Sequence, residues 1–508
     1  MKTKLSDQEI NKLVNLFKEN KIQEFNNLRE LLLKNHQDSY ELFNLLGVLE
    51  IQRDNFYVAK KYFLKSYEQN CNYLPCIRNL INIYRKEKNY LKLKDKLIRY
   101  IEIDQASHEL LLELGILLKN INQFKESIKY LKKFIDFDPK NSKAYNSLAL
   151  AHYWNGDFKE AYEAFKKSIK LNDKKDKRLL LIYDLAEHLK YDLEPYLKEF
   201  QQILKNKTDL NTGIYLRIAK YKEKNKEFDS ALTLYIKLNE LKNDNFKKPY
   251  WANLDQIKHN IDKLKKIKFN PKPSALKSKP IFILGLPRSG TSLLEQMLSA
   301  HKNIIGLGEL ENFLLPGRQV FYQPEYLNED SLQNFRTFSL TKIMNKYNFE
   351  NEKYFIDKNP MNFEIIPILK HVFPESKIIY NNRDSKDICW SIFTANLQDS
   401  FFNINLKSII EYINYHKRLM DLYLNLYAED IYINYYENLI SEPYENINKI
   451  LNFIGLKMDK NCLSPESNAK SIRTASVMQA RNIISMKKVR RWEQYKDYLD
   501  PFYKDLKQ

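Results

Sequence analysis

The sequence has few cysteines, little glycine and no long apolar run, and each absence excludes a class of protein. Only 10 of the 508 residues are glycine, which favours a helix-rich architecture with few tight turns. The four cysteines lack histidine or cysteine partners at metal-binding spacing, so we expect free thiols in a reducing compartment. No run of 18 apolar residues occurs and the first residues form no apolar signal region. We therefore expect a soluble, cytoplasmic protein without a membrane span.

The positive charge of the chain is not organised as a nucleic-acid surface. The formal net charge is +19, yet lysine is spread along the whole length without a dense Lys/Arg block or a base-reading motif. We therefore expect anionic partners other than nucleic acid. A chain of 508 residues with 44% hydrophobic residues is long enough for two or more domains, each with a sizeable core.

Residues 38–172 repeat a pattern with a period of 34. A small or apolar residue recurs at this interval, and a larger apolar residue follows it by four positions. The small residue lets two antiparallel helices approach closely, and the large one fills the gap against the next repeat. The pattern resembles the tetratricopeptide repeat, whose solenoid presents a concave face to a peptide or a partner protein. The recurring positions are Ala59, Leu93, Ser127 and Ala161, followed by Phe63, Leu97, Leu131 and Phe165.

Further segments extend this array and then end it. Residues 6–33 are amphipathic and predict an entry helix pair, and another unit follows around Ala231 and Tyr235. Prolines and lysines near residues 264–280 break the helical periodicity, as in an extended linker. The predicted organisation is an α-helical repeat solenoid over residues 1–265, a linker over 266–279 and a second domain over 280–508.

A glycine turn follows the linker directly. Ile281–Leu284 is long enough for a buried parallel strand and too short for a helix, whereas the periodic apolar residues after Gly290 predict a helix. Such a turn places backbone N–H groups at a helix N-terminus, where anions bind. The spacing Gly285-x4-Gly290 matches a phosphate-binding loop, but Thr291 occupies the position of the usual lysine. Arg288 supplies a cation instead, and a strand–turn–helix with a solvated arginine is the competing interpretation.

Two more short apolar segments, residues 377–381 and 430–434, alternate with helical patterns and predict an α/β domain with a parallel sheet. The carboxyl ends of parallel strands share one edge of the sheet, where ligands bind. Polar residues follow all three strands: Arg288 and Ser289, then Arg383 and Asp384, then Tyr435, Tyr436 and Glu437. These three groups favour an anion site over a solvated turn.

The segment Pro287–Glu295 resembles the 5′-phosphosulfate loop of sulfotransferases that use 3′-phosphoadenosine 5′-phosphosulfate (PAPS). In particular, the chain resembles protein-tyrosine sulfotransferases and their bacterial relatives with tetratricopeptide repeats. Arg383 and Ser391, eight residues apart, resemble the family's 3′-phosphate motif, and on a strand-to-helix junction both side chains can reach one phosphate. The resemblance implies that the P-loop-like turn binds the donor through Arg288, Ser289, Gly290, Thr291 and Ser292.

The resemblance also implies catalytic residues. Lys358 matches the lysine that stabilises the bridging oxygen as it leaves. Glu309, 21 residues after Arg288, matches the base that accepts the proton of the acceptor hydroxyl, and Glu311 is the alternative. Three further matches imply contacts to the nucleotide: Tyr436, with Tyr435 as the alternative, Ser476 and Arg491.

The implied activity is transfer of a sulfuryl group from PAPS to a hydroxyl, first of all to tyrosine of a peptide or protein bound with the help of the repeats. Carbohydrate or small-molecule O-sulfation and a non-catalytic repeat adaptor that binds a nucleotide are the alternatives. A P-loop kinase is disfavoured because the loop lacks its lysine and no aspartate partner for Mg²⁺ is evident. No metal is needed, since cations already stabilise the phosphate leaving group. The acceptor, whether peptide, protein or glycan, stays open.

Overall fold

The structure is a computed structural model that describes residues 5–172, 177–205, 210–242, 253–397, 402, 405–465 and 489–506. The chain divides into two units, one formed by Met1–Ala151 with Lys342–Asn348 and the other by His152–Thr341 with Phe349–Gln508. The domain boundaries expected at 265/266 and 279/280 stay predictions. Among the described residues, no helix is both long enough and apolar enough to cross a membrane.

The first unit is built from helix pairs. Its first helix begins with a capping box, in which Ser6 Oγ accepts the N–H of Glu9 at 3.3 Å and Glu9 Oε2 accepts the N–H of Ser6 at 2.9 Å. The helices are α1 (Asp7–Lys18), α2 (Ile22–Asn35), α3 (Tyr40–Gln52), α4 (Phe56–Gln69), α5 (Leu74–Lys86), α6 (Tyr90–Ile103), α7 (His108–Asn120) and α8 (Phe124–Phe137), followed by α9 (Ser142–Asn155), which continues into the second unit.

The period of 34 places its small and large residues at helix contacts. All eight recurring positions are buried and lie in α4, α6, α8 and α10 (Phe158–Leu171). In α3, a Cβ added to Gly47 would lie 2.5 Å from the ring of Phe63 in α4. In α7, a Cβ added to Gly115 would lie 2.6 Å from Leu131 in α8. The predicted helical solenoid is confirmed, and these close approaches are its physical basis.

The second unit begins with further helices of the same kind. Ala231 and Tyr235, the predicted small and large pair, are both fully buried in α14. In α15, the Asn260 amide donates from Nδ2 to the carbonyl of Phe321 at 3.0 Å, which ties α15 to the α/β part of the unit. These helices are α11 (Lys177–His188), α12 (Glu194–Ile203), α13 (Asn211–Lys224), α14 (Phe228–Lys242) and α15 (Leu254–Lys266).

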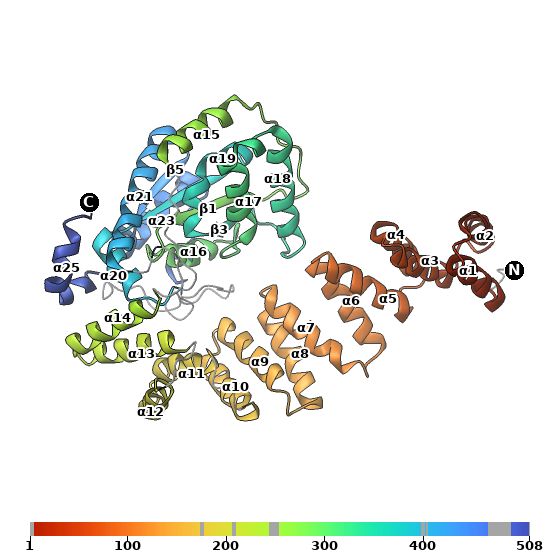
Figure 1. Cartoon of the computed structure of the whole chain (residues 1–508), viewed down its shortest axis with the longest axis horizontal. Coiled ribbons are helices and arrows are strands. Elements are labelled where there is room, and N and C mark those ends of the chain that lie inside the picture. The colour runs from red at the N-terminus through yellow and green to blue at the C-terminus, as the bar shows by residue number, and fades with distance from the viewer. Residues whose placement is uncertain are drawn as a thin grey trace. The chain divides into compact units, whose positions relative to one another are not determined.

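A parallel 5-stranded sheet with the order β2-β3-β1-β4-β5 forms the centre of the α/β part (Figure 1). The register places Ile283 opposite Lys358 and Gly285 opposite Asn381, so the strand ends that carry the candidate residues are neighbours. The predicted α/β parallel sheet is confirmed, with two strands that the sequence patterns did not predict, β2 and β3. The strands are β1 (Lys279–Gly285), β2 (Ile304–Gly306), β3 (Tyr354–Lys358), β4 (Lys377–Asn382) and β5 (Ile431–Tyr435).

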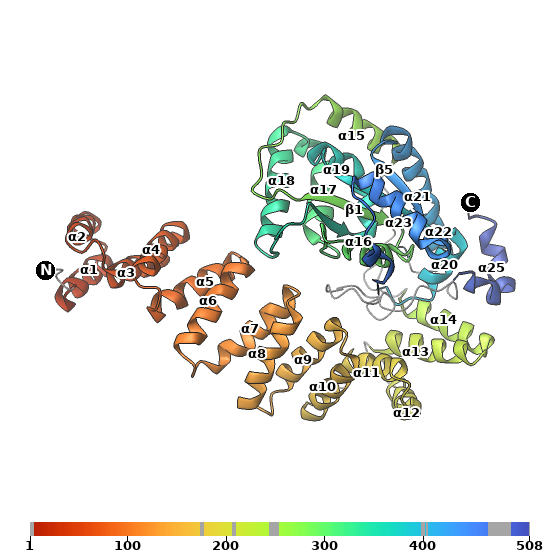
Figure 2. The same ribbon diagram turned by 180° about the vertical axis from the view of Figure 1, so that it is seen from behind.

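Helices cover both faces of this sheet, as Figures 1 and 2 show from opposite sides. Ile281 and Ile283 pack with helices α16 and α23 on one face. Phe282 points to the other face and meets Phe313 of α17 edge-on, with 5.2 Å between ring centroids. The helices are α16 (Thr291–Ser299), α17 (Glu311–Tyr322), α18 (Glu329–Met344), α19 (Ile366–Val372), α20 (Ser385–Phe393), α21 (Leu406–Leu426), α22 (Tyr436–Ser441), α23 (Pro443–Ile454) and α25 (Lys496–Tyr503), with the 3₁₀ turns η2 (Pro324–Tyr326), η3 (Pro360–Ile365), η4 (Lys460–Leu463) and η7 (Arg491–Tyr495).

Candidate functional site

The turn from β1 to α16 requires glycine at two positions. Gly285 has φ 148°, and an added Cβ would lie 2.5 Å from the carbonyl oxygen of Asn381. Gly290 is the N-cap of α16 with φ 97°, and an added Cβ would lie 2.6 Å from Cε2 of Tyr436. Arg288 between them has φ 73°, a conformation that is strained for a residue with a Cβ. The backbone therefore approaches the end of the sheet closely, and the turn leads into the N-terminus of α16, the end of a helix that attracts anions.

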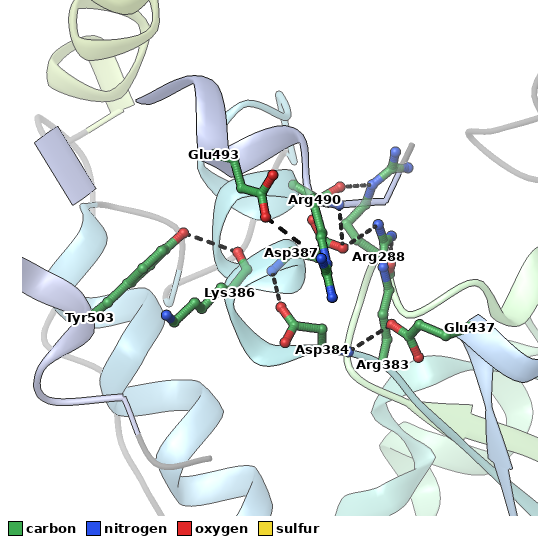
Figure 3. A network of polar contacts seen from close by, with 10 residues as sticks. Arg288, Arg383, Asp384, Lys386, Asp387, Glu437, Arg490, Glu493 and Tyr503 are labelled. Atoms are coloured by element: carbon green, nitrogen blue, oxygen red, sulfur yellow. Dashed lines mark hydrogen bonds and ion pairs between the residues drawn. The ribbon is translucent and has the colours of Figure 1, made fainter. Parts of the chain in front are cut away.

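Arg288 and Arg383 join this turn to α20, as Figure 3 shows in part. Nε of Arg288 donates to Oγ of Ser391 at 3.1 Å, and Nη1 of Arg383 donates to the carbonyl of Arg288 at 3.0 Å. The guanidinium of Arg383 also lies 4.6 Å from the ring centroid of Tyr436. Burial lowers the pKa of Arg288, and the neighbouring charges of Arg383 and Arg491 lower it further. Four predicted donor-binding residues thus converge on one place.

Carboxylates near Arg383 hold the start of α20 (Figure 3). Oδ2 of Asp387 lies 3.6 Å from Nη2 of Arg383 and accepts the N–H of Arg490 at 2.9 Å. The N–H of Asp387 donates to Oδ1 of Asp384, the N-cap of α20, at 2.9 Å. The N–H of Asp384 in turn donates to Oε1 of Glu437 at 3.0 Å. Arg383 therefore pairs with Asp387 through Nη2 while its Nη1 bonds the turn.

Amide side chains at the ends of β4 and β5 hold the turn from the other side. Nδ2 of Asn381 donates to the carbonyl of Ser289 at 2.6 Å, and Nδ2 of Asn434 donates to Oδ1 of Asn381. The Ser289 hydroxyl is buried without a hydrogen-bond partner among the described residues. Thr291 is buried and Ser292 half-buried in the first turn of α16. The two asparagines follow apolar strand residues and were not predicted as part of the site.

Lys358 and Glu309 form a second cluster one strand away. Lys358 ends β3 with its side chain 1% exposed, and its Nζ pairs with Oε1 of Glu309, whose side chain is 54% exposed. The N–H of Lys358 donates to the carbonyl of Gly308 at 2.9 Å, which holds the Glu309 loop against the strand. Glu311, the alternative base, begins α17 with an exposed side chain. The geometry pairs the predicted lysine with Glu309.

Two buried carboxylates that the sequence analysis did not assign clamp the backbone around Glu309. Oε1 of Glu295 accepts the N–H of Gly308 at 2.8 Å, and Oδ1 of Asp357 accepts the N–H of Leu310 at 3.0 Å. Burial raises the pKa of Glu295 to about 7 and that of Asp357 to about 7. Glu295 ends the glycine-loop motif and Asp357 precedes the motif lysine. Their positions in these motifs could have predicted that both residues belong to the site.

The remaining predicted contacts lie towards the C-terminus. Arg491 begins η7, and its Nη2 lies 2.6 Å from Oε2 of Glu223 in α13. Its charge contributes to the lowered pKa of Arg288, so it belongs to the same cationic cluster. Ser476 lies outside the described residues. Tyr436 is buried against Gly290, whereas its alternative Tyr435 is 47% exposed.

The site therefore consists of a cationic cluster at the glycine turn and a lysine–glutamate pair on the neighbouring strand. The partnerless buried hydroxyl of Ser289, the helix N-terminus that begins after Gly290 and the converging arginines fit an anionic ligand with phosphate or sulfate groups. Among the described residues, no group of three or more His, Cys, Asp and Glu side chains could hold a metal ion.

Comparison with protein families agrees with this geometry. Residues 280–460 match the family model described as "Sulfotransferase family". Residues 108–141 and 142–175 each match a tetratricopeptide repeat model.

Comparison with single proteins finds distant relatives. An uncharacterized protein of Aquifex aeolicus (strain VF5) is 25% identical over 468 residues, which cover 86% of this chain and 59% of that protein. A putative protein-tyrosine sulfotransferase of Caenorhabditis briggsae is 28% identical over 196 residues, 36% of this chain and 68% of that protein. The solved sulfotransferase domain of the Synechococcus PCC 7002 olefin synthase has a TM-score of 0.32 and 20% identity, over 44% of this chain and 91% of that domain. The chain thus carries tetratricopeptide repeats within residues 108–175 and a sulfotransferase-family match over residues 280–460.

Proposed function

We propose that this chain transfers a sulfuryl group from PAPS to the hydroxyl of an acceptor, with tyrosine of a peptide or protein as the preferred class. One observation carries the proposal: the Arg288–Ser391 hydrogen bond and the Lys358–Glu309 pair lie at neighbouring strand ends. Since β3 and β4 flank β1, a donor held at the turn has phosphate-binding groups on one side and an acid–base pair on the other.

The donor's 5′-phosphosulfate fits the turn itself. The N–H groups of Gly290 and Thr291 and the hydroxyls of Thr291 and Ser292 are the proposed hydrogen-bond donors at the positive end of α16, whereas the N–H of Ser289 donates to the carbonyl of Leu286. Arg288 adds a full charge with a planar fork. The 3′-phosphate is assigned to Arg383, Ser391 and Arg491, with Ser476 as a further predicted contact.

The second cluster, Lys358 and Glu309, is assigned to the transfer step. When bound, PAPS supplies an activated sulfuryl group, whose bond to the bridging oxygen breaks to leave 3′-phosphoadenosine 5′-phosphate (PAP). A carboxylate oxygen of Glu309 accepts the acceptor's hydroxyl proton while the acceptor oxygen forms its bond to sulfur. The ammonium of Lys358 neutralises the charge that develops on the bridging oxygen, and its buried position strengthens that effect.

Two observations favour tyrosine as the acceptor. The Caenorhabditis briggsae relative is named a putative protein-tyrosine sulfotransferase, and solenoids of this repeat type present extended surfaces suited to peptides. A phenol is also the easier nucleophile, because its pKa of about 10 lies far below that of an aliphatic alcohol. Sulfation of a carbohydrate or a small molecule would use the same donor site. It differs from the proposed reaction only in the acceptor, so acceptor assays distinguish the two.

The test is incubation of the full chain with radiolabelled PAPS and three acceptors: a tyrosine peptide, a glycan and a small phenol. We expect label on the peptide, and we expect Glu309→Gln to lower turnover by roughly 100-fold or more. Glu311→Gln makes the same charge change two residues away on an exposed side chain and is the matched control. PAP that raises the melting temperature without any labelled acceptor would identify the non-catalytic adaptor instead.

A further inference from the structure

Helix α14 of the last repeat packs on α20, the helix that carries Ser391, and the two lie side by side in Figures 1 and 2. The indole of Trp390 in α20 meets the ring of Tyr235 in α14 edge-on, with 5.7 Å between centroids. Trp390 also lies 4.3 Å from the ring of Tyr495 in η7, which Phe228 of α14 contacts at 5.8 Å. An aromatic core therefore joins the repeat helix to the two elements that carry Ser391 and Arg491.

Polar contacts from α14 also cap the C-terminus of α20. Nδ2 of Asn239 donates to the carbonyl of Phe393 at 3.0 Å, and Nζ of Lys242 donates to the carbonyl of Ala395 at 2.7 Å. Both side chains are buried, and burial lowers the pKa of Lys242 to about 8. Carbonyls at a helix end lack helical partners and favour a cation, so these bonds satisfy groups that α20 cannot satisfy itself. The last repeat is thus part of the framework of the site.

Helix α13 reaches the cationic cluster directly. Oε2 of Glu223 lies 2.6 Å from Nη2 of Arg491 and accepts the hydroxyl of Tyr235 at 2.9 Å. Glu223 is held on both sides by these contacts, and its own side chain is 16% exposed. A carboxylate so restrained limits the orientations open to the Arg491 fork.

Lys220 lies one helical turn before this carboxylate on α13. Its side chain is accessible to solvent, although the surrounding protein removes much of its hydration. That loss of hydration and the charges of Arg217, Arg288 and Arg491 together lower the pKa of Lys220 to about 8, although the charge of Asp184 opposes the shift. The two carboxylates of Asp184 and Glu223 offset only part of the charge of this lysine and its arginines, so a bound anion would stabilise the group further.

We propose that α13 belongs to the donor site, where Lys220 contacts the 3′-phosphate of the nucleotide and Glu223 positions Arg491 for the same group. This inference rests on the proposed function, because it requires an adenosine nucleotide at the glycine turn. A phosphate dianion between Lys220, Arg288 and Arg491 replaces their mutual repulsion by attraction. In this proposal the repeats have two roles: they help to bind the acceptor, and they contribute residues to the donor site.

The test is calorimetric titration of the full chain with PAP and with adenosine 5′-phosphate, which lacks the 3′-phosphate. Lys220→Met is expected to weaken PAP binding by roughly 10- to 100-fold, the range of one charge-assisted hydrogen bond, with less than a threefold effect on adenosine 5′-phosphate. Lys220→Arg keeps the charge and is expected to retain most of the affinity. Lys222, on the same helix, pairs with Glu227 at 2.7 Å, so Lys222→Met is the matched control and leaves both affinities unchanged.

The role of Glu223 is tested by the affinity of the chain for PAP relative to adenosine 5′-phosphate. Replacing a purely structural residue would leave this ratio unchanged. Glu223→Gln is expected to lower the affinity ratio of PAP to adenosine 5′-phosphate several-fold, and Glu223→Asp to restore it in part. Equal loss for both nucleotides with a lower melting temperature would overturn the positioning role, and unchanged PAP binding by Lys220→Met would overturn the contact. If the unsubstituted chain binds no PAP, the proposed function itself fails, which is a distinct outcome.

Discussion

Lys358 and Glu309 form an ion pair whose two ends lie in opposite surroundings, with the lysine side chain 1% exposed and the glutamate side chain 54% exposed. The carboxylate offsets the cost of burying the ammonium at the end of β3. Because the carboxylate itself remains accessible, it can meet a hydroxyl that arrives from solvent. One contact therefore serves both the fold and the proposed proton transfer.

Lys358→Met is expected to lower kcat by roughly 100- to 1,000-fold, the usual effect of removing one group that stabilises developing charge. PAP affinity should change by less than about threefold, since methionine keeps the volume of the stem and the donor-binding arginines are untouched. Steady-state kinetics and PAP titration check both values. Lys302→Met, at an exposed lysine before β2, is the control. Turnover within threefold of the unsubstituted chain would remove Lys358 from the mechanism.

Glu295→Gln is expected to make the fold less sensitive to pH. Burial raises the pKa of Glu295 from 4.5 to about 7, so the folded state holds a proton that the unfolded state has already lost between these values. The stability of the unsubstituted chain therefore falls as pH rises from about 4.5 to about 7. Glutamine keeps an oxygen for the N–H of Gly308 and has no proton to lose.

The difference in unfolding free energy between Glu295→Gln and the unsubstituted chain should therefore be near zero at pH 4.5. It should grow in favour of the variant to at most about 3 kcal/mol at pH 8. Urea unfolding at both pH values measures this difference. A variant that loses stability relative to the parent as pH rises would contradict the raised pKa of Glu295.

Gly290→Ala is expected to destabilise the fold more than Gly455→Ala and to abolish PAP binding. Both glycines have positive φ, 97° and 84°, so both substitutions share a conformational cost of about 1–2 kcal/mol. A Cβ at Gly290 would also collide with the buried ring of Tyr436, whereas one at Gly455 meets nothing within 4 Å. We expect an additional loss of about 1–3 kcal/mol for Gly290→Ala in urea unfolding. Equal losses for the two variants would show that the ring of Tyr436 moves to accommodate the added Cβ and that the contact costs nothing.

Gly47→Ala is expected to destabilise the repeats of the first unit. Alanine gains about 1 kcal/mol of helix propensity over glycine, but the added Cβ lies 2.5 Å from the ring of Phe63, and overpacking costs about 1–3 kcal/mol. The net loss should be up to about 2 kcal/mol. Phe63→Leu removes the obstructing ring atoms, so the double variant should be more stable than the sum of the single effects predicts. Strict additivity in thermal unfolding would exclude this contact as the cause.

Local pattern was sufficient for the repeats and for the glycine turn. Ala59 and Phe63 are four residues apart and therefore lie on one helix face. This pairing of a small residue with a large one can be read directly from the sequence. The strands at 281–284, 377–381 and 430–434 were predicted for the same reason, since continuous apolar runs mark buried parallel strands.

Strand β3 was not predicted because two charged residues at its end, Asp357 and Lys358, interrupt the apolar run that would indicate a buried strand. Asp357 and Lys358 are 0% and 1% exposed, a burial that their residue types argue against. They are tolerated there because Leu310 and Asn362 donate hydrogen bonds to the aspartate and Glu309 pairs with the lysine. None of these partners is adjacent in the chain, so a local pattern does not contain them.

The helical repeats, the glycine turn and the types of residue available for an anion site follow from the order of the residues, because each depends on neighbours within a few positions. Which of these residues meet depends on how the chain packs. Arg288 reaches Ser391 across 103 residues and Arg491 reaches Glu223 across 268, and such pairings arise when strand order and helix packing bring distant segments together. The assignment of α13 to the site is therefore a property of the packed chain, since no segment of the sequence carries it alone.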